Sequence, residues 1–304
     1  MRIYGAKVQF GRLQMQIVAV QTRSYMSKAT IVLFLVLIAL GVFVWLQEPP
    51  VSERVDQVEI GSANESWIAV VTVFRPKANG RYPLLVLNHG QDSRIGEPKD
   101  RLSYGAVARF FARRGYVVIV PMRPGFGGSS GRIKSAGCEN ALARIRAMSD
   151  RVGSVVEHYS SDPAIDHEKV VFAGVSMGAL VSLGLAADER FRSRTLAVLA
   201  FAPVMINPNC DWQRWLHEAL GTLGREVVAP SIWFVGESDP WLPSALAKSL
   251  FSSYFAGGLK GEFHELPISG IDGHDLLNGY PQLPLWWPYV ERFLQESGLP
   301  TRNR

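Results

Sequence analysis

One stretch of the chain, residues 169–185, limits the possible folds more than any other. Its sequence is KVVFAGVSMGALVSLGL, and residues 170–174 form a short apolar run that is typical of a buried β-strand. From Met177 onward the stretch is rich in small side chains and indicates a helix. Ser176 lies between the two elements, so the sequence predicts a strand that turns sharply into a helix at a serine.

The turn around Ser176 has the pattern Gly-x-Ser-x-Gly, with Gly174 and Gly178 on either side. Glycine fits both places, because such a turn is strained and its helix must pass close to neighbouring strands. The serine hydroxyl is then held exposed at the positive end of the helix, where backbone N–H groups stabilise a developing negative charge. We call residues 174–178 the elbow and predict that Ser176 is a nucleophile.

Expected strands and helices alternate on both sides of the elbow. Strands are expected at residues 84–87, 116–120, 195–201, 231–235 and 262–266, and helices at residues 104–114, 140–159, 212–223, 244–255 and 287–295. Two strands with alternating polar and apolar residues come before them, at 55–60 and 67–74. This order predicts an α/β fold: a doubly wound, mostly parallel sheet with helices on both faces, fronted by an antiparallel pair.

Candidate partners for Ser176 follow other strands, because ligands of such sheets bind at the carboxyl ends of the strands. A serine hydroxyl needs a base to take its proton and a third group to fix the tautomer of that base. His274 follows the last expected strand and Asp239 follows the one before it. We therefore predict His274 as the base and Asp239 as the acid, in the chain order Ser, Asp, His. Glu237 and Asp211 remain alternatives for the acid.

His274 is preferred over the other histidines because of its place in the chain. Four of the others lie before the elbow, inside an expected helix or within an expected strand: His158, His167, His217 and His264. A structural alternative for His274 is a loop histidine that bonds its own neighbours, Asp272 or Asp275.

The predicted site also needs two backbone N–H donors aimed at the tetrahedral oxyanion. One is the N–H of Met177, the residue after the nucleophile. The other should come from the loop after the strand at 84–87, where Gln91 is our choice. His89 and Gly90 precede it in this loop, and we interpret His89 as a brace for the loop rather than as a second base.

The predicted chemistry is a two-step acyl transfer. His274 removes the Ser176 proton, an acyl-enzyme forms with loss of the alcohol or amine, and water activated by the same histidine releases the acid. These steps require no metal and no organic cofactor, and the Asp and His residues near the site lack a metal-ligand spacing. Four late tryptophans either line an apolar acyl pocket or pack in the core: Trp233, Trp241, Trp286 and Trp287.

Two cysteines flank the expected mouth of the site. Cys138 opens the helix that comes after the glycine-rich loop at 123–129, and Cys210 follows the strand at 195–201. Outside the cytoplasm they could form one disulfide that holds the two loops together. Two free thiols are the alternative.

The positive net charge of +5 is concentrated in an N-terminal tail. Five of the 32 Lys and Arg residues lie in residues 1–28, which contain no acid, so the other 27 balance the 27 Asp and Glu. The body of the chain is therefore neutral, which argues against a nucleic-acid-binding face.

Residues 29–46 form an uncharged apolar run directly after this tail. At about 1.5 Å per helical residue the run nearly spans a hydrocarbon core, and we predict a transmembrane signal anchor. The positive charge before it places the N-terminus in the cytoplasm and the body in the periplasm or outside the cell. Alternatives are a cleaved signal peptide, which would leave the body secreted, and a buried core helix. Met26 is a second candidate for the start of the chain.

The predicted organisation follows from these segments. It comprises a basic cytoplasmic tail at 1–28, the anchor at 29–46, a linker at 47–55, the α/β domain at 56–298 and a C-terminal tail at 299–304.

Five motifs carry a resemblance to a known family: residues 87–90 (Leu-Asn-His-Gly), 123–129 (Arg-Pro-Gly-Phe-Gly-Gly-Ser), the elbow, 236–240 (Gly-Glu-Ser-Asp-Pro) and 272–274 (Asp-Gly-His). Together they resemble the α/β-hydrolases, and within them the dienelactone-hydrolase-related branch. The resemblance implies ester or related acyl hydrolysis by Ser176, His274 and Asp239, with the Gln91 and Met177 amides at the oxyanion. Dienelactone hydrolase itself uses a cysteine nucleophile, whereas this chain has a serine.

We therefore expect a serine hydrolase that cleaves a carboxylic ester, or a related acyl bond, of a small-molecule substrate. A serine peptidase or an acyltransferase would use the same residues. A non-catalytic, membrane-tethered binding module on the same fold is the alternative from another class. The acyl group, the leaving group and the oligomeric state stay open.

Overall fold

The protein divides into two compact units, Met1–Glu48 and Pro49–Arg304. The computed structural model describes residues 5–6, 17–18, 49–62, 65–91, 101–132, 137–268, 272–277 and 279–303. In the first unit, β1 (Gly5–Ala6) pairs antiparallel with β2 (Ile17–Val18). The predicted anchor at 29–46 lies outside the described residues. Within the described ranges, no helix has the length and apolar character needed to cross a membrane.

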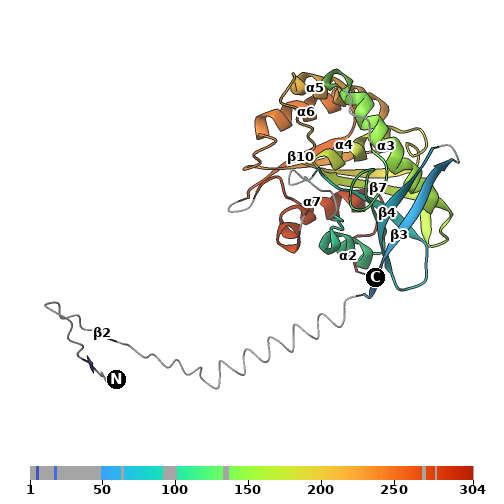
Figure 1. Ribbon diagram of the computed structural model, residues 1–304, viewed down its shortest axis with the longest axis horizontal. Coiled ribbons are helices and arrows are strands. Elements are labelled where there is room, and N and C mark those ends of the chain that lie inside the picture. Colours follow the sequence, from blue (N-terminus) through green and yellow to red (C-terminus); the bar gives the residue numbers. More distant parts are fainter. Residues whose placement is uncertain are drawn as a thin grey trace. The chain divides into compact units, whose positions relative to one another are not determined.

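The second unit is built on one eight-stranded sheet, drawn in Figure 1. Its strands are β3 (Val51–Ser62), β4 (Glu65–Pro76), β5 (Tyr82–Asn88), β6 (Val117–Pro121), β7 (Ile165–Val175), β8 (Thr195–Phe201), β9 (Ser231–Gly236) and β10 (Gly261–Leu266). They lie in the order β10-β9-β8-β7-β5-β6-β4-β3. The six strands from β10 to β6 run parallel, and β4 and β3 continue the sheet antiparallel. The predicted mostly parallel sheet with an antiparallel pair is confirmed.

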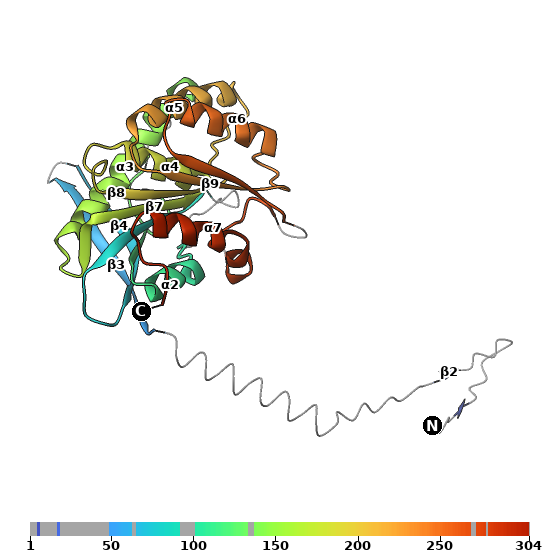
Figure 2. The ribbon, with the colours of Figure 1, turned by 180° about the vertical axis from the view of Figure 1, so that it is seen from behind.

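Helices cover both faces of this sheet, as Figures 1 and 2 show from opposite sides. One face carries α3 (Ala141–His158), α4 (Met177–Ala187), α5 (Trp212–Glu226) and α6 (Ser244–Phe255), and the other carries α2 (Gly105–Arg113) and α7 (Leu283–Glu296). Single 3-10 turns lie at Cys138–Asn140, Tyr159–Ser161 and Tyr280–Gln282. Each face of the sheet therefore has its own hydrophobic core.

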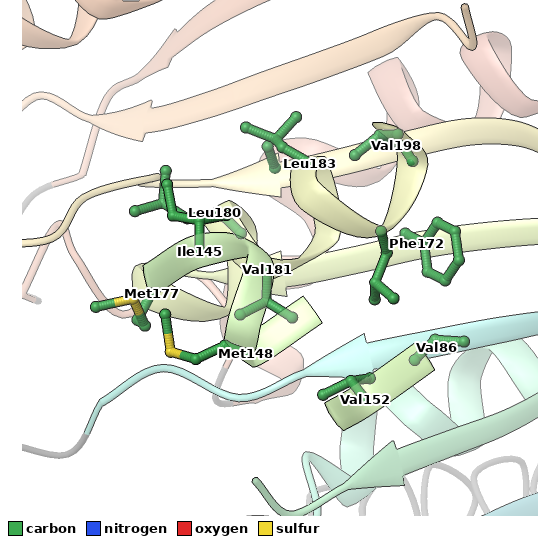
Figure 3. Close-up of a cluster of buried hydrophobic side chains, with 14 of the residues drawn as sticks. Val86, Ile145, Met148, Val152, Phe172, Met177, Leu180, Val181, Leu183 and Val198 are labelled. Atoms are coloured by element: carbon green, nitrogen blue, oxygen red, sulfur yellow. The ribbon is translucent and has the colours of Figure 1, made fainter. Parts of the chain in front are cut away.

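The helix that begins at the elbow, α4, is buried along its whole length. Figure 3 shows its side chains in one cluster with those of the sheet and of α3. The labelled residues are Met177, Leu180, Val181 and Leu183 of α4, Val86, Phe172 and Val198 of the sheet, and Ile145, Met148 and Val152 of α3. Because protein covers it on all sides, α4 can be apolar all round. Burial of one large aliphatic side chain is worth about 1.5–3 kcal/mol, so this packing holds the start of α4 firmly against the sheet.

Several boundaries differ from the sequence expectation. β3 begins at Val51, inside the predicted linker, because it pairs with β4 along its whole length, from Val51 opposite Pro76 onward. The predicted C-terminal tail is also packed, with buried Leu299 and a hydrogen bond of 2.9 Å from the Tyr116 hydroxyl to the carbonyl of Pro300. His167 lies in β7 rather than in the connection before it.

The last helix, α7, begins at Leu283, although the sequence predicted a start at Trp287. Pro284 lies in its first turn, where a backbone N–H has no partner within the helix and its loss costs nothing. A second proline, Pro288, lies inside the helix. The two prolines made this part of the sequence look non-helical.

Candidate active site

Ser176 occupies the predicted turn between β7 and α4. β7 ends at Val175 and α4 begins at Met177, and Ser176 has φ +58° and ψ −126°. A non-glycine residue in such a conformation costs about 1–3 kcal/mol, so the surroundings must hold it. The Ser176 N–H donates to the carbonyl of Phe201 at 2.8 Å, and its own carbonyl accepts from the Ala179 N–H at 3.0 Å. These bonds fix the elbow to β8 and to the first turn of α4.

The two glycines of the elbow allow the close approach that the sequence predicted. A Cβ atom added to Gly178 would overlap the carbonyl oxygen of Asn88, at the end of β5. A Cβ atom added to Gly174 would overlap the carbonyl oxygen of Gly178. Because the obstacles are backbone atoms, side-chain rotation cannot relieve either overlap.

Asp239 and His274 are brought together at the ends of β9 and β10. His274 Nδ1 lies 2.8 Å from Asp239 Oδ2, and the Asp239 side chain is fully buried. The second oxygen, Asp239 Oδ1, accepts from the backbone N–H groups of Trp241 at 2.8 Å and Leu242 at 2.9 Å. A carboxylate accepts and does not donate, so Nδ1 carries the proton and Nε2 of His274 is left with a lone pair. This is the tautomer that a general base needs.

Ser176 and His274 line the same cavity, which has a volume of about 420 Å³. The His274 side chain is 18% exposed, so one face of the imidazole reaches the cavity. Among the described residues no hydrogen bond joins Ser176 to His274; such bonds are often long without substrate and shorten when it binds. The cavity therefore holds the predicted nucleophile and the predicted base, with Asp239 behind the base.

The loops that carry Asp239 and His274 touch through two glycines. A Cβ on Gly273 would lie 2.6 Å from the Asp239 backbone nitrogen, and a Cβ on Gly236 would lie 2.7 Å from the Gly273 Cα. Farther along, Trp286 of α7 donates its Nε1–H to the Leu276 carbonyl at 3.0 Å. Sequence reasoning missed these supports. The glycines at the end of β9 and next to His274 were the only available signal.

The alternative acids and bases have other surroundings. Glu237 is exposed, and Asp211 caps α5 by accepting from the Arg214 N–H at 3.4 Å. The remaining histidines outside the loop after β5 contact residues that do not line the cavity: His264 contacts Glu262, His217 contacts Ser253, His167 contacts Glu168 and His158 meets the Tyr159 ring edge-on. Asp272 accepts from the His274 backbone N–H at 2.9 Å, so it supports the turn and leaves the imidazole to Asp239.

The two predicted oxyanion donors, Met177 and Gln91, also line the cavity. Met177 is the first residue of α4, and the first N–H groups of a helix have no partner within it. Gln91 lies three residues after the end of β5. The N–H of the intervening Gly90 is used, since it donates to the Tyr104 hydroxyl at 3.2 Å. Tyr104, which the sequence did not single out, lines the cavity as well.

His89 has both ring nitrogens engaged within the protein. Nδ1 donates to the Gly90 carbonyl at 2.7 Å, and Nε2 accepts from the Arg123 N–H at 3.1 Å. The residue is fully buried, and burial together with the nearby Arg123 charge holds the pKa of His89 well below its usual value. A neutral imidazole with no free nitrogen fits a brace for the loop and does not fit a second base.

The wall of the cavity is partly apolar and carries two carboxylates. Its apolar part includes Val204, Met205, Ile206 and Trp241, and its described acidic residues are Asp272 and Asp275. No Lys or Arg lies in the described lining. Of the four late tryptophans, Trp241 is the one that lines the cavity and is 47% exposed; Trp233 and Trp286 are buried, and Trp287 packs on Phe110.

The sequence also predicted a site without a metal ion and a disulfide between Cys138 and Cys210. In the part of the chain that the structure describes, no group of three or more His, Cys, Asp or Glu residues could hold a metal ion. Cys210 is disulfide-bonded. The other cysteine in the sequence is Cys138, whose side chain lies outside what the structure describes.

Comparison with known protein families identifies the family of this chain. Residues 84–297 match the model of the alpha/beta hydrolase family. The chain belongs to this family. Its mixed, mostly parallel sheet with helices on both faces is the α/β-hydrolase fold. No curated protein matches the chain.

Several solved structures share the fold at low sequence identity. A dienelactone hydrolase-like promiscuous phosphotriesterase from metagenomic libraries has a TM-score of 0.55 and 14% identity, over 81% of this chain and 98% of that one. An esterase of Pyrococcus furiosus has a TM-score of 0.54 and 16% identity, over 81% and 92%. A cold-adapted esterase from an Arctic intertidal metagenomic library has a TM-score of 0.54 and 16% identity, over 83% and 95%. The likeness extends over nearly the whole of each relative.

Proposed function

We propose that this α/β-hydrolase is a serine hydrolase that cleaves carboxylic esters through an acyl-enzyme on Ser176. The observation that carries the proposal is the contact of 2.8 Å between His274 Nδ1 and the buried Asp239, beside the cavity that Ser176 lines. Esterases among the structural relatives support the same chemistry.

In each half of the proposed reaction His274 acts first as a base and then as an acid. His274 Nε2 takes the Ser176 hydroxyl proton as Oγ attacks the ester carbonyl carbon, and the oxyanion accepts from the Gln91 and Met177 N–H groups. The proton then passes from His274 to the leaving alcohol, whose bond to carbon breaks. Water then attacks the acyl carbon and gives a proton to His274, which passes it to Ser176 Oγ as the bond between Oγ and the acyl carbon breaks and the acid leaves. Asp239 stabilises the imidazolium that forms in each step.

The lining favours neutral acyl groups over anionic ones. Apolar side chains such as Ile206 and Trp241 offer an apolar surface to an acyl chain. Asp275 in the lining would repel a substrate carboxylate, and no Lys or Arg among the described lining residues could bind one. We therefore propose a neutral small-molecule ester as the substrate class.

Labelling by a fluorophosphonate probe tests the catalytic role. The wild-type protein should label, and Ser176→Ala should not. Equal labelling of the two proteins, or no labelling of either, would contradict the proposal and favour a non-catalytic module. Matched ester and amide substrates with one acyl group then separate an esterase from a peptidase, and an added alcohol acceptor detects acyl transfer.

We also propose that the catalytic domain lies outside the cytoplasm, held by a membrane anchor at residues 29–46. The apolar run preceded by a basic tail supports this location. The disulfide at Cys210 supports it too, since disulfides persist in oxidising compartments. Cell fractionation with N-terminal sequencing is the test. A mature N-terminus after residue 46 would replace the anchor with a cleaved signal, and recovery in the cytoplasm would overturn the location.

A further inference from the structure

A buried cation lies directly behind the loop that carries Gln91. The side chain of Arg123, which follows β6, is only 2% exposed. Its guanidinium donates from Nη1 to the carbonyl of His89 and from Nη2 to the carbonyl of Gly90, the latter at 3.0 Å. The ring of Phe126 lies 5.3 Å from its Cζ atom. Burial lowers the pKa of Arg123 to about 10, so the group is still charged at neutral pH.

Burial of the Arg123 charge lowers the stability of the folded protein unless its contacts compensate. Removing a charge from water is expensive unless the charge is paired, and within the described residues no carboxylate pairs with Arg123. Its partners are two backbone carbonyls that follow one another in the chain. In a regular strand successive carbonyls point to opposite sides, so the loop after β5 has a special conformation, which the guanidinium fork holds.

The consequence for Gln91 follows from peptide geometry. The C=O of Gly90 and the N–H of Gln91 belong to one planar trans peptide, in which the two groups point in opposite directions. The Gly90 oxygen is held by Arg123 Nη2 and by His89 Nδ1. The Gln91 N–H therefore points away from the guanidinium, and both Gly90 and Gln91 line the cavity.

We propose that Arg123 is a positioning residue, which acts through the Gly90–Gln91 peptide to aim the Gln91 N–H at the oxyanion. The proposal rests on the proposed function of the site. The guanidinium charge also polarises this peptide through the bond to its carbonyl, so that the N–H becomes a stronger donor. The substrate never touches Arg123.

Two substitutions test the role by separating kcat from KM for a neutral aryl ester. Arg123→Met removes the fork and the charge, and kcat should fall about 10²–10³-fold, as for the loss of one oxyanion donor, with little change in KM. Arg123→Lys keeps the charge but not the two-pronged geometry, so its kcat should lie between those of Arg123→Met and the wild type. The affinity of a boronic acid, which forms a tetrahedral adduct on Ser176, should fall in step with kcat/KM.

Arg114→Met is the matched control. The Arg114 guanidinium also stacks on an aromatic ring, 3.4 Å from the Phe110 centroid, and bonds a backbone carbonyl, but it lies at the end of α2 and does not line the cavity. Its loss should lower the thermal unfolding temperature without changing kcat or boronate affinity.

Each outcome decides one question. A folded Arg123→Met with wild-type kcat and boronate affinity overturns the positioning role, and so does a kcat loss that Arg114→Met reproduces. If Arg123→Met does not fold, Arg123→Lys decides, because wild-type boronate affinity in that variant would overturn the need for the fork. A wild-type protein that no fluorophosphonate labels would instead sink the proposed function itself.

Discussion

The substitution Gly273→Ala tests whether the close contact between two loops sets the geometry of the base. The added Cβ would lie 2.6 Å from the Asp239 nitrogen and 2.8 Å from the Ser238 carbonyl carbon. Nonbonded carbon contacts are about 3.5 Å or more, so the loops must separate by roughly 1 Å. Both neighbours are backbone atoms, and no side-chain rotation relieves the overlap. The distance of 2.8 Å between His274 Nδ1 and Asp239 Oδ2 would then exceed the hydrogen-bond limit of about 3.2 Å.

The expected cost can be given in advance. A misplacement of about 1 Å lowers the rate about 10²-fold, which corresponds to about 2.7 kcal/mol of barrier. The assay is kcat/KM for a neutral aryl ester, with thermal unfolding measured in parallel. Gly221→Ala is the control, because Gly221 lies in α5 and its added Cβ would make only ordinary contacts, at 3.6 Å to the Ser253 oxygen and 3.8 Å to Arg225 Nη1. A folded Gly273→Ala protein with wild-type kcat/KM would refute the reasoning.

Three more outcomes are expected from the same structure. Asp239→Asn should lower kcat about 10⁴-fold while the protein stays folded, because an amide cannot fix the His274 tautomer or stabilise the imidazolium. The rate of ester hydrolysis measures the loss of kcat, and circular dichroism shows whether the protein is folded. Asp275→Asn should raise the ratio of kcat/KM for a half-ester with a free carboxylate to kcat/KM for the neutral ester by about fivefold, because one partly screened charge is worth about 1 kcal/mol. The same ratio in the variant and the wild type would show that Asp275 does not set this selectivity. The pKa of His89 is depressed in the folded protein, where the imidazole is neutral. Below the pKa of about 6.5 that a histidine has in the unfolded chain, the unfolded state gains a proton that the folded state does not. The free energy of unfolding is therefore unaffected by the titration of His89 above that pH and falls below it, by up to about 1.4 kcal/mol per pH unit. His89→Asn should flatten urea-unfolding stability between neutral and mildly acidic pH, and an unchanged slope would show that another group sets it.

The parts of the site that the sequence predicted are those that local pattern and chain order determine. Ser176 was evident because the residues that shape its turn are its own neighbours, Gly174 and Gly178. Asp239 and His274 were found from farther away, since the carboxyl ends of parallel strands meet at one edge of a sheet. The fold was predictable for the same reason: each buried strand and each helix has its own hydrophobic period.

What the sequence did not reveal depends on contacts between distant segments. Nothing near Arg123 in the chain indicates that its side chain folds back under the carbonyls of His89 and Gly90. The contact of Gly273 with the Asp239 loop is likewise set by how β9 and β10 pack side by side. The start of α7 was missed for a local reason, since Pro284 and Pro288 look unfavourable for a helix whose packing with buried Trp286 outweighs them.

The attachment of the His274 loop to α7 has a consequence for biosynthesis. Leu276 and Leu277 are buried, and Trp286 bonds the Leu276 carbonyl, so the proposed base is held in place by a helix that leaves the ribosome after the elbow does. The elbow and its helix are made about a hundred residues earlier. Because domains fold as units during synthesis, the growing chain contains Ser176 before the His274 loop is fixed in place. The proposed activity therefore appears only once α7 has packed against the domain.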